Sequence, residues 1–102
     1  MYRLSYLAAA SRDIADVALY IAEALKAPKA ALELLDALDE SIFRLKEFPY
    51  SCRAYLPVKP LEYEYRILNV KNYAVLYVVD EQLKTVEICR VIYAKRNFDK
   101  QL

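Results

Sequence analysis

Residues 65–79 read YRILNVKNYAVLYVV, and this stretch decides the fold. It is rich in β-branched and aromatic residues, which favour strands, and its apolar pattern breaks only at Lys71-Asn72. Two residues between two such runs predict a tight hairpin, in which we expect Asn72 to take the positive φ that glycine usually supplies. We therefore predict antiparallel strands over Tyr65–Val70 and Tyr73–Val79.

The pattern continues toward the carboxy end. Thr85–Tyr93 is again rich in β-branched and aromatic residues, and a short turn at Asp80–Lys84 joins it to the preceding strand. Such a short connection requires antiparallel pairing. On the amino-terminal side of the hairpin, Tyr50–Val58 is ambiguous; it could be a short or edge strand, because Pro57 interrupts it.

The first half of the chain has the period of helices. Residues 2–7 alternate and predict a first strand, after which Ser11 offers a helix N-cap with Asp13 in the first turn. Ala27 ends this helix, and Pro28 suits the first position of a second helix that runs to Pro49. The apolar stripes are Ile14, Val17, Ala18, Ile21 and Leu25 in the first helix, and Ala31, Leu34, Leu35, Leu38, Ile42 and Leu45 in the second.

Together these elements predict an α+β fold. Their order is β-α-α-β-β-β, with an antiparallel sheet and a helical hairpin packed on one of its faces. With no repeat, linker or low-complexity tract, residues 1–102 are expected to form a single domain. The other face of the sheet should be partly open, and a functional surface could lie there.

Two missing residue types limit the chemistry. The chain has no histidine, which excludes Ser-His and Cys-His triads and the HExxH metal helix. It has no glycine, which excludes phosphate-binding glycine loops and makes nucleotide cofactors improbable. Cys52 and Cys89 are too few for a four-ligand zinc site or a disulfide framework. We expect no cofactor and no metal.

Charge and hydropathy suggest where partners are found. The net charge of +1 divides into −2 over residues 1–48 (6 basic, 8 acidic) and +3 over residues 49–102 (9 basic, 6 acidic). The carboxy-terminal part is thus better suited to a phosphate backbone or an acidic partner. The sequence has no apolar stretch of the ~20 residues that a membrane span needs, and no secretory signal pattern, so we expect a cytoplasmic protein.

Several segments together resemble the RelE/ParE toxins of bacterial type II toxin–antitoxin systems. They are YRILNV and NYAVLY within residues 65–77, and VEICRVIYAKRNF at residues 86–98. Further pieces in the same order are SRDI at residues 11–14, Tyr20-Ile21 and the LKEFP of residues 45–49. The chain departs from the family at Lys71, where glycine is common, and in having neither a histidine nor an evident glutamate base in the site.

The resemblance implies two activities on one fold. RelE-type toxins cut mRNA in the ribosomal A site, and ParE-type toxins inhibit DNA gyrase. Our first interpretation is a ribosome-dependent, metal-independent mRNA endoribonuclease neutralised by a cognate antitoxin; the alternatives are a gyrase inhibitor without nuclease activity and a degenerate toxin. A compact cluster of Arg66 with Arg90 or Arg96 would favour the nuclease, and a dispersed set with a long exposed helical hairpin would favour the gyrase inhibitor.

In the nuclease interpretation, the resemblance places five side chains around the scissile phosphate, where they would hold charge and move protons: Arg66, Arg90, Tyr93, Lys95 and Arg96. Each also has a structural interpretation. Arg66 could be the polar end of a buried face, and Arg90 could form a structural salt bridge, since it shares a strand face with Ile88 and Ile92 in a regular strand. Tyr93 could be packing, and the Lys95-Arg96 pair a solvated chain end.

The resemblance also implies an antitoxin whose tail wraps the toxin as a helix in a groove or as a strand on the sheet edge. Basic side chains of the site would then meet acidic or polar antitoxin residues. In this interpretation Arg66→Ala or Arg96→Ala abolishes toxicity and leaves antitoxin binding intact.

Overall fold

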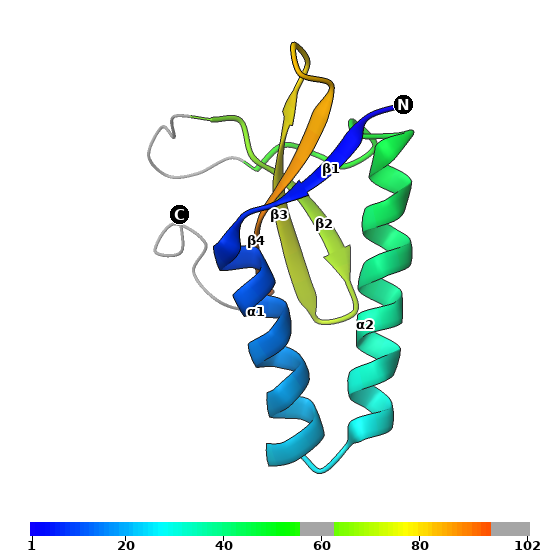
Figure 1. The fold of residues 1–102 in the computed structure, drawn as a ribbon, viewed down its shortest axis with the longest axis vertical. Helices are drawn as coiled ribbons and strands as arrows, with labels where there is room; N and C mark the ends of the chain where they lie inside the picture. Colours follow the sequence, from blue (N-terminus) through cyan, green and yellow to red (C-terminus); the bar gives the residue numbers. More distant parts are fainter. Residues whose placement is uncertain (56–62, 95–102) are drawn as a thin grey trace.

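The computed structural model describes residues 1–55 and 63–94. A strand opens the chain, two helical segments follow, and three strands complete the fold (Figure 1). The order β-α-α-β-β-β is therefore confirmed. The elements are β1 (Arg3–Tyr6), α1 (Ala8–Leu19), the π-helix η1 (Tyr20–Ala24), α2 (Pro28–Phe43), the 3-10 turn η2 (Arg44–Lys46), β2 (Arg66–Val70), β3 (Tyr73–Asp80) and β4 (Thr85–Tyr93).

The four strands form one mixed sheet in the order β1-β4-β3-β2. The predicted antiparallel pairing is found between β2 and β3 and between β3 and β4. β1 instead pairs parallel with β4, so that Arg3 lies opposite Thr85 and Tyr6 opposite Ile88. Parallel neighbours need a long connection, and the chain between β1 and β4 provides it, since it passes through both helices and through β2 and β3.

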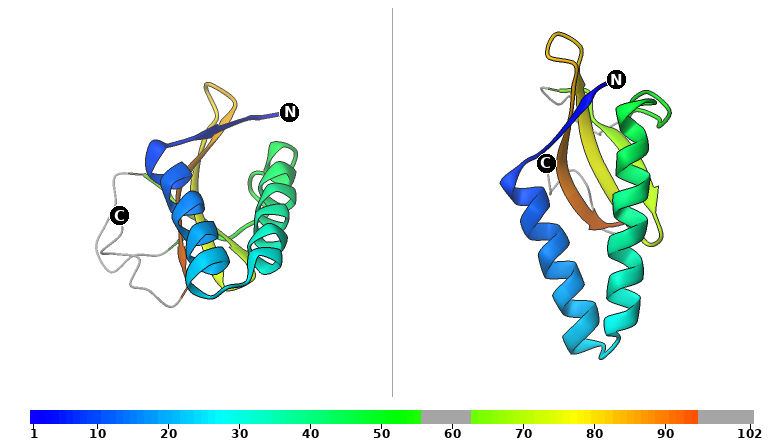
Figure 2. Two further views of the ribbon diagram at one scale, coloured as in Figure 1. Left: turned by 60° about the horizontal axis from the view of Figure 1, so that its bottom comes forward. Right: turned by 45° about the vertical axis from the view of Figure 1, so that its right-hand side comes forward.

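Both helices cover the same face of the sheet (Figure 2). Their buried side chains pack with the inward residues of the strands to make the main core, which includes the following residues: Ala10, Leu34, Leu38, Ile42, Leu45, Val70, Val75, Tyr77, Val86, Ile88 and Val91. A smaller cluster of Ile67, Ala74, Leu76 and Ile92 lies on the opposite face, with Tyr55 packed against it. These four side chains are at most 6% exposed, so the centre of that face is not the open surface that we expected.

The start of α1 differs from the prediction. The helix begins at Ala8 with Leu7 as its N-cap, and Ser11 lies inside the first turns. The reason is a tertiary contact. The backbone N–H of Leu7 donates to the carbonyl of Ile88 in β4, and the helix begins at the next residue, where the pairing of β1 with β4 ends. Asp13 is thereby displaced from the first turn and becomes available to the sheet. Pro28 does begin α2, as predicted.

The hairpin between β2 and β3 has the expected two-residue turn, with Val70 opposite Tyr73. The positive φ falls on Lys71 (53°), not on Asn72, and that expectation is wrong. Within Tyr50–Val58, Ala54 forms an isolated bridge with Arg66, and residues 56–58 lie outside the described part of the chain. No helix within residues 1–55 and 63–94 is long and apolar enough to span a bilayer.

Candidate functional site

Arg90 is held by Asp13 of α1. The Nε of Arg90 donates to Asp13 Oδ2 at 2.7 Å, and its Nη2 donates to Oδ1 at 3.1 Å. The same carboxylate accepts the backbone N–H of Val91 at 3.0 Å. β1 pairs with β4 only as far as Ile88, so Asp13 satisfies a backbone donor that lies beyond the end of β1. The hydrogen bond with Asp13 raises the pKa of Arg90 and keeps the guanidinium charged.

A register shift explains why Arg90 can reach α1. Leu76 lies opposite Arg90, whereas the next residue, Tyr77, lies opposite Ile88, so β4 contains one extra residue at this point. Ile88 consequently belongs to the core under the helices, and Ile92 belongs to the cluster on the other face. The expectation that Arg90 shares one face with both isoleucines is wrong, because it assumed a regular strand.

Arg66 lies on β2, in register with Tyr77 of β3. Its Nη1 donates to the carbonyl of Cys52 at 2.7 Å, and its guanidinium carbon lies 4.8 Å from the centre of the Tyr50 ring. A longer ion pair with Glu64 measures 3.5 Å. With 18% of its side chain exposed, Arg66 fastens the segment after α2 to the edge of the sheet.

Tyr77 reinforces this attachment. Its buried hydroxyl donates to the carbonyl of Pro49 at 2.7 Å, and burial is the main cause that raises the pKa of Tyr77 above its ordinary value. The described residues thus keep Arg66 and Arg90 apart, on strands separated by β3. Two strand spacings separate their backbones by roughly 10 Å, and each guanidinium is bonded to a different part of the protein.

The remaining predicted site residues lie at the end of β4. Tyr93 is 39% exposed and packs edge-to-face on Tyr73, with 5.8 Å between the ring centroids. Lys95 and Arg96 lie outside the described residues. Tyr93 therefore keeps an accessible ring at one end of the sheet, away from Arg66 on β2.

A groove runs between the helical hairpin and the end of the sheet, with a volume of about 940 Å³. Its apolar lining includes Val17, Ile21, Leu34 and Val91. Further lining residues come from the β2–β3 turn and from both helices. The lining residues that are polar, charged or aromatic are Asp13, Asp16, Tyr20, Glu33, Lys71, Asn72, Tyr73, Arg90 and Tyr93. We call this hollow the hairpin groove.

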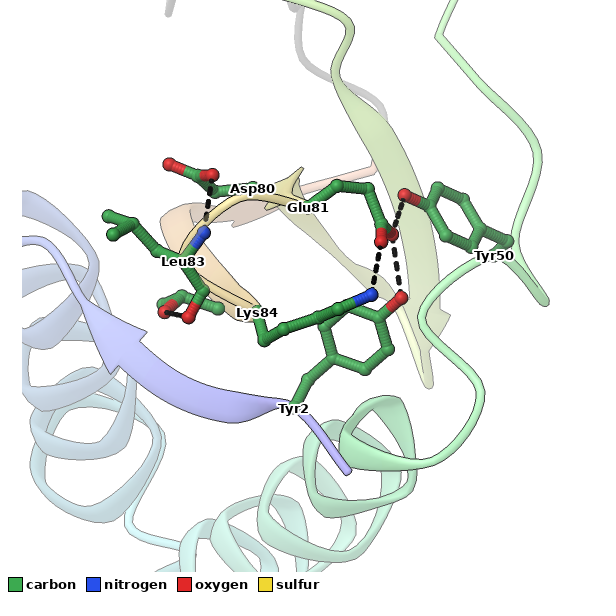
Figure 3. Close-up of polar contacts among 7 residues, drawn as sticks. Tyr2, Tyr50, Asp80, Glu81, Leu83 and Lys84 are labelled. Atoms are coloured by element: carbon green, nitrogen blue, oxygen red, sulfur yellow. Dashed lines mark hydrogen bonds and ion pairs between the residues drawn. The ribbon is translucent and has the colours of Figure 1, made fainter.

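A second polar cluster surrounds Glu81 at the tip of the β3–β4 hairpin (Figure 3). Tyr2 donates to Glu81 Oε2 at 2.6 Å, Tyr50 donates to the same oxygen, and Lys84 Nζ lies 2.7 Å from Oε1. These bonds, first that of Lys84, lower the pKa of Glu81 to about 2. The cluster joins the amino end, the tip of β3–β4 and the segment after α2. It was not predicted, because nothing in the local sequence around Glu81 indicates its tyrosine partners.

Four tyrosines have a pKa raised above the ordinary value: Tyr2, Tyr6, Tyr50 and Tyr77. Hydrogen bonding to Glu81 raises the pKa of Tyr50 to about 12. These four hydroxyls are therefore poorly suited to act as a base, which needs a lowered pKa. Burial raises the pKa of Cys89 to about 11, so this thiol is not activated. No group of three or more Cys, Asp or Glu side chains in the described ranges could hold a metal ion.

Comparison with known proteins gives a consistent picture. The family model described as ParE toxin of type II toxin–antitoxin systems, parDE, matches residues 4–98. The chromosomal ParDE toxin–antitoxin system of P. aeruginosa contains a similar chain with a TM-score of 0.73 and 16% identity, covering 93% of this chain and 98% of that one. A RelBE toxin–antitoxin complex from Mycobacterium tuberculosis gives 0.63 and 22% over 90% and 96% of the two chains.

The isolated E. coli RelE toxin gives a TM-score of 0.60 at 12% identity, over 99% of this chain and 93% of that one. At these low identities, the TM-scores show a shared fold and nothing further. No curated protein sequence matches the chain significantly.

Proposed function

Because this chain belongs to the ParE toxin family of type II toxin–antitoxin systems, we propose that it acts as a protein-binding toxin that inhibits DNA gyrase and does not cut RNA. The supporting observation is the dispersal of the two described candidate arginines. Arg90 makes a two-point contact with Asp13, and Arg66 is bonded to the Cys52 carbonyl. Each guanidinium thus uses part of its five N–H donors on a protein partner, and the charge of Arg90 is balanced by Asp13, which leaves less of either for a phosphate.

The helical hairpin offers the alternative kind of surface. Four large apolar side chains near its closed end are exposed by more than half: Leu19, Tyr20, Leu25 and Leu32. The hairpin end projects past the sheet in Figure 1, so it can reach a partner without the strands. Exposed apolar side chains gathered on one projection are typical of protein–protein contact. A toxin that binds a protein needs such a surface and needs no general base.

The test uses purified toxin in a gyrase supercoiling assay with relaxed plasmid and ATP. Leu19→Glu and Leu32→Glu place a charge on each helix at little cost in helix propensity. Leu83→Glu is the matched control, since Leu83 is 63% exposed at the β3–β4 tip, far from the hairpin end in sequence. We expect wild type and Leu83→Glu to block supercoiling alike, and the two hairpin variants to need roughly tenfold more protein.

The same preparations go into a cell-free translation reaction with primer extension on the mRNA. In our proposal no new 5′ ends appear. Uninhibited supercoiling by the wild type, together with ribosome-dependent ends inside the reading frame, would overturn it. Loss of those ends in Arg66→Ala and Arg96→Ala would then assign the site to the nuclease interpretation, with Tyr93 and Lys95 as further residues to test.

A further inference from the structure

A second hollow lies beside β1 and shares no lining residue with the hairpin groove. Its volume is about 670 Å³, and it lies between β1 and the end of α2 with the first residue of η2. Phe43 is 60% exposed there and Tyr6 is 40% exposed. We call it the β1 hollow, and six residues line it: Leu4, Tyr6, Asp39, Glu40, Phe43 and Arg44.

The outer edge of β1 carries backbone donors that can pair with another strand. The N–H of Arg3 donates to the carbonyl that immediately precedes β4, and the N–H of Tyr2 donates in the other direction, to Lys46 in η2. Because successive N–H groups of a strand point to opposite edges, those of Leu4 and Tyr6 also point away from β4. Within residues 1–55 and 63–94, neither meets a carbonyl of another element. β1 is therefore an edge strand on the border of an exposed apolar surface.

The charges of the β1 hollow complement one another across a two-fold axis. Asp39 and Glu40 come first along the chain and Arg44 follows, and all three side chains are exposed. None of the three makes an ion pair with another residue of the described ranges. A two-fold axis between the acids and the arginine places each Arg44 opposite the acids of a second copy. The patch thus matches itself in charge, which a contact between identical chains requires.

We infer that two copies of the toxin associate through the β1 hollow as a two-fold symmetric dimer. Phe43 and Tyr6 of each copy pack against the hollow of the other, and each Arg44 pairs with the two carboxylates opposite. The two β1 strands lie antiparallel, so that the outward N–H groups of Leu4 and Tyr6 bond to carbonyls of the second copy. A second copy is the occupant because both signs of charge and a strand edge lie on one surface.

The closed end of the helical hairpin stays free in this dimer. α2 starts beside that end at Pro28 and reaches the β1 hollow at Phe43 (Figure 1). Its 16 residues separate the two places by about 24 Å. The dimer therefore presents two copies of the exposed apolar projection, and a target with two equivalent sites would bind it with higher avidity. The inference goes beyond the proposed function and does not depend on gyrase as the target.

The first experiment measures association by analytical ultracentrifugation of the full-length toxin, separated from co-expressed antitoxin, from about 1 to about 100 µM. We expect a monomer–dimer equilibrium. Arg44→Glu makes the charged lining wholly acidic, and the double variant Asp39→Lys, Glu40→Lys makes it wholly basic. Like charges then face each other across the axis, so each change should raise the dimer dissociation constant about tenfold. Phe43→Ser removes the exposed ring and should have a similar effect.

The matched controls reverse charges at exposed positions of α2 outside the β1 hollow. They are Lys29→Glu and Asp36→Lys, and each should keep the dissociation constant within about twofold of the wild type. Circular dichroism establishes that every variant keeps the fold. Wild-type toxin that is monomeric at about 100 µM, or control and hollow variants with equal dissociation constants, would overturn the inference.

An equimolar mixture of the acidic and the basic variant is the sharpest measurement. In their heterodimer, opposite charges meet at both contacts, so association should return to the wild-type level or exceed it. Native mass spectrometry separates this heterodimer from either homodimer by mass. Two variants that weaken their own dimers without forming the heterodimer would show that the charges do not face each other, and the inference would fail.

Two further titrations separate this inference from its alternatives. A wild-type toxin that stays monomeric, with hollow variants that bind antitoxin more weakly than the controls do, would assign the β1 hollow to the antitoxin and overturn the dimer. Supercoiling assays on the same preparations test the proposed function independently. A dimeric wild type that leaves gyrase unaffected would remove the proposed function and leave the dimer in place.

Discussion

Removal of the Asp13 carboxylate tests the polar link that joins α1 to β4. Asp13→Ala deletes three hydrogen bonds, two from Arg90 and one from the backbone N–H of Val91. Breaking a fully buried ion pair costs about 3–5 kcal/mol, and a backbone donor left without an acceptor costs about 1–3 kcal/mol. The side chains of Arg90 and Asp13 are 27% and 17% exposed, so water replaces part of the loss.

We therefore expect Asp13→Ala to lower the free energy of unfolding by about 2–4 kcal/mol. For a chain of this size that corresponds to a fall in Tm of roughly 10–20 °C. Asp13→Asn keeps an acceptor for Val91 but loses the charge that holds Arg90, and it should cost about half as much. The assay is urea unfolding followed by circular dichroism, with a thermal scan for Tm.

Two controls make the comparison sharp. Asp16→Ala lies one turn further along α1 with an exposed side chain, and it should change stability by less than about 0.5 kcal/mol. In a double-mutant cycle, Asp13→Ala and Arg90→Ala should couple by about 1–3 kcal/mol, because both remove the same pair. Asp13→Ala with the stability of Asp16→Ala would refute the reasoning.

Three further results are expected from the buried hydroxyl, the acidic cluster and the glycine-free turn. Tyr77→Phe leaves the carbonyl of Pro49 without its donor and should cost about 1–2 kcal/mol in urea unfolding; wild-type stability would mean that water replaces the bond. The folded pKa of Glu81, about 2, lies below its ordinary 4.5, so its contribution to stability is present above pH 4.5 and lost as pH falls through 2. Glu81→Gln should flatten the dependence of stability on pH in this window, and an unchanged dependence would contradict a stabilising role of the Glu81 cluster. Lys71 has φ of 53°, so Lys71→Gly should raise stability by about 0.5–1 kcal/mol, and a loss of stability would show that the lysine side chain matters more than its backbone.

The strands could be predicted because their signals are local. Thr85–Tyr93 is confirmed with the predicted bounds, and the hairpin turn at Lys71-Asn72 is found where the apolar runs break. The errors occur where distant parts of the chain decide. The parallel pairing of β1 and the helix start at Ala8 both depend on β4, which lies some 80 residues further along the chain.

The glycine-free turns show another limit. Positive φ occurs at Lys26, Lys71 and Lys84, each at a point where the chain reverses between elements. Intrinsic preference favours asparagine over lysine in this region, which is why Asn72 was expected to take it. At a two-residue hairpin the register of the strands fixes which residue has the unusual conformation, and that register is set by packing on both sides of the sheet.

The candidate site is the hardest part to predict, for a related reason. The sequence identifies Arg66 and Arg90 as cations on strands, but what each can do depends on partners 14 and 77 positions away. Asp13 stands within a segment that carries the family resemblance, and in the structure it binds Arg90 of another such segment. The segments that carry the family resemblance therefore also contribute contacts that stabilise the fold. A cation that holds the fold together in this way is already engaged by a protein partner, so the family can be recognised from these segments while the activity must be decided from side-chain contacts.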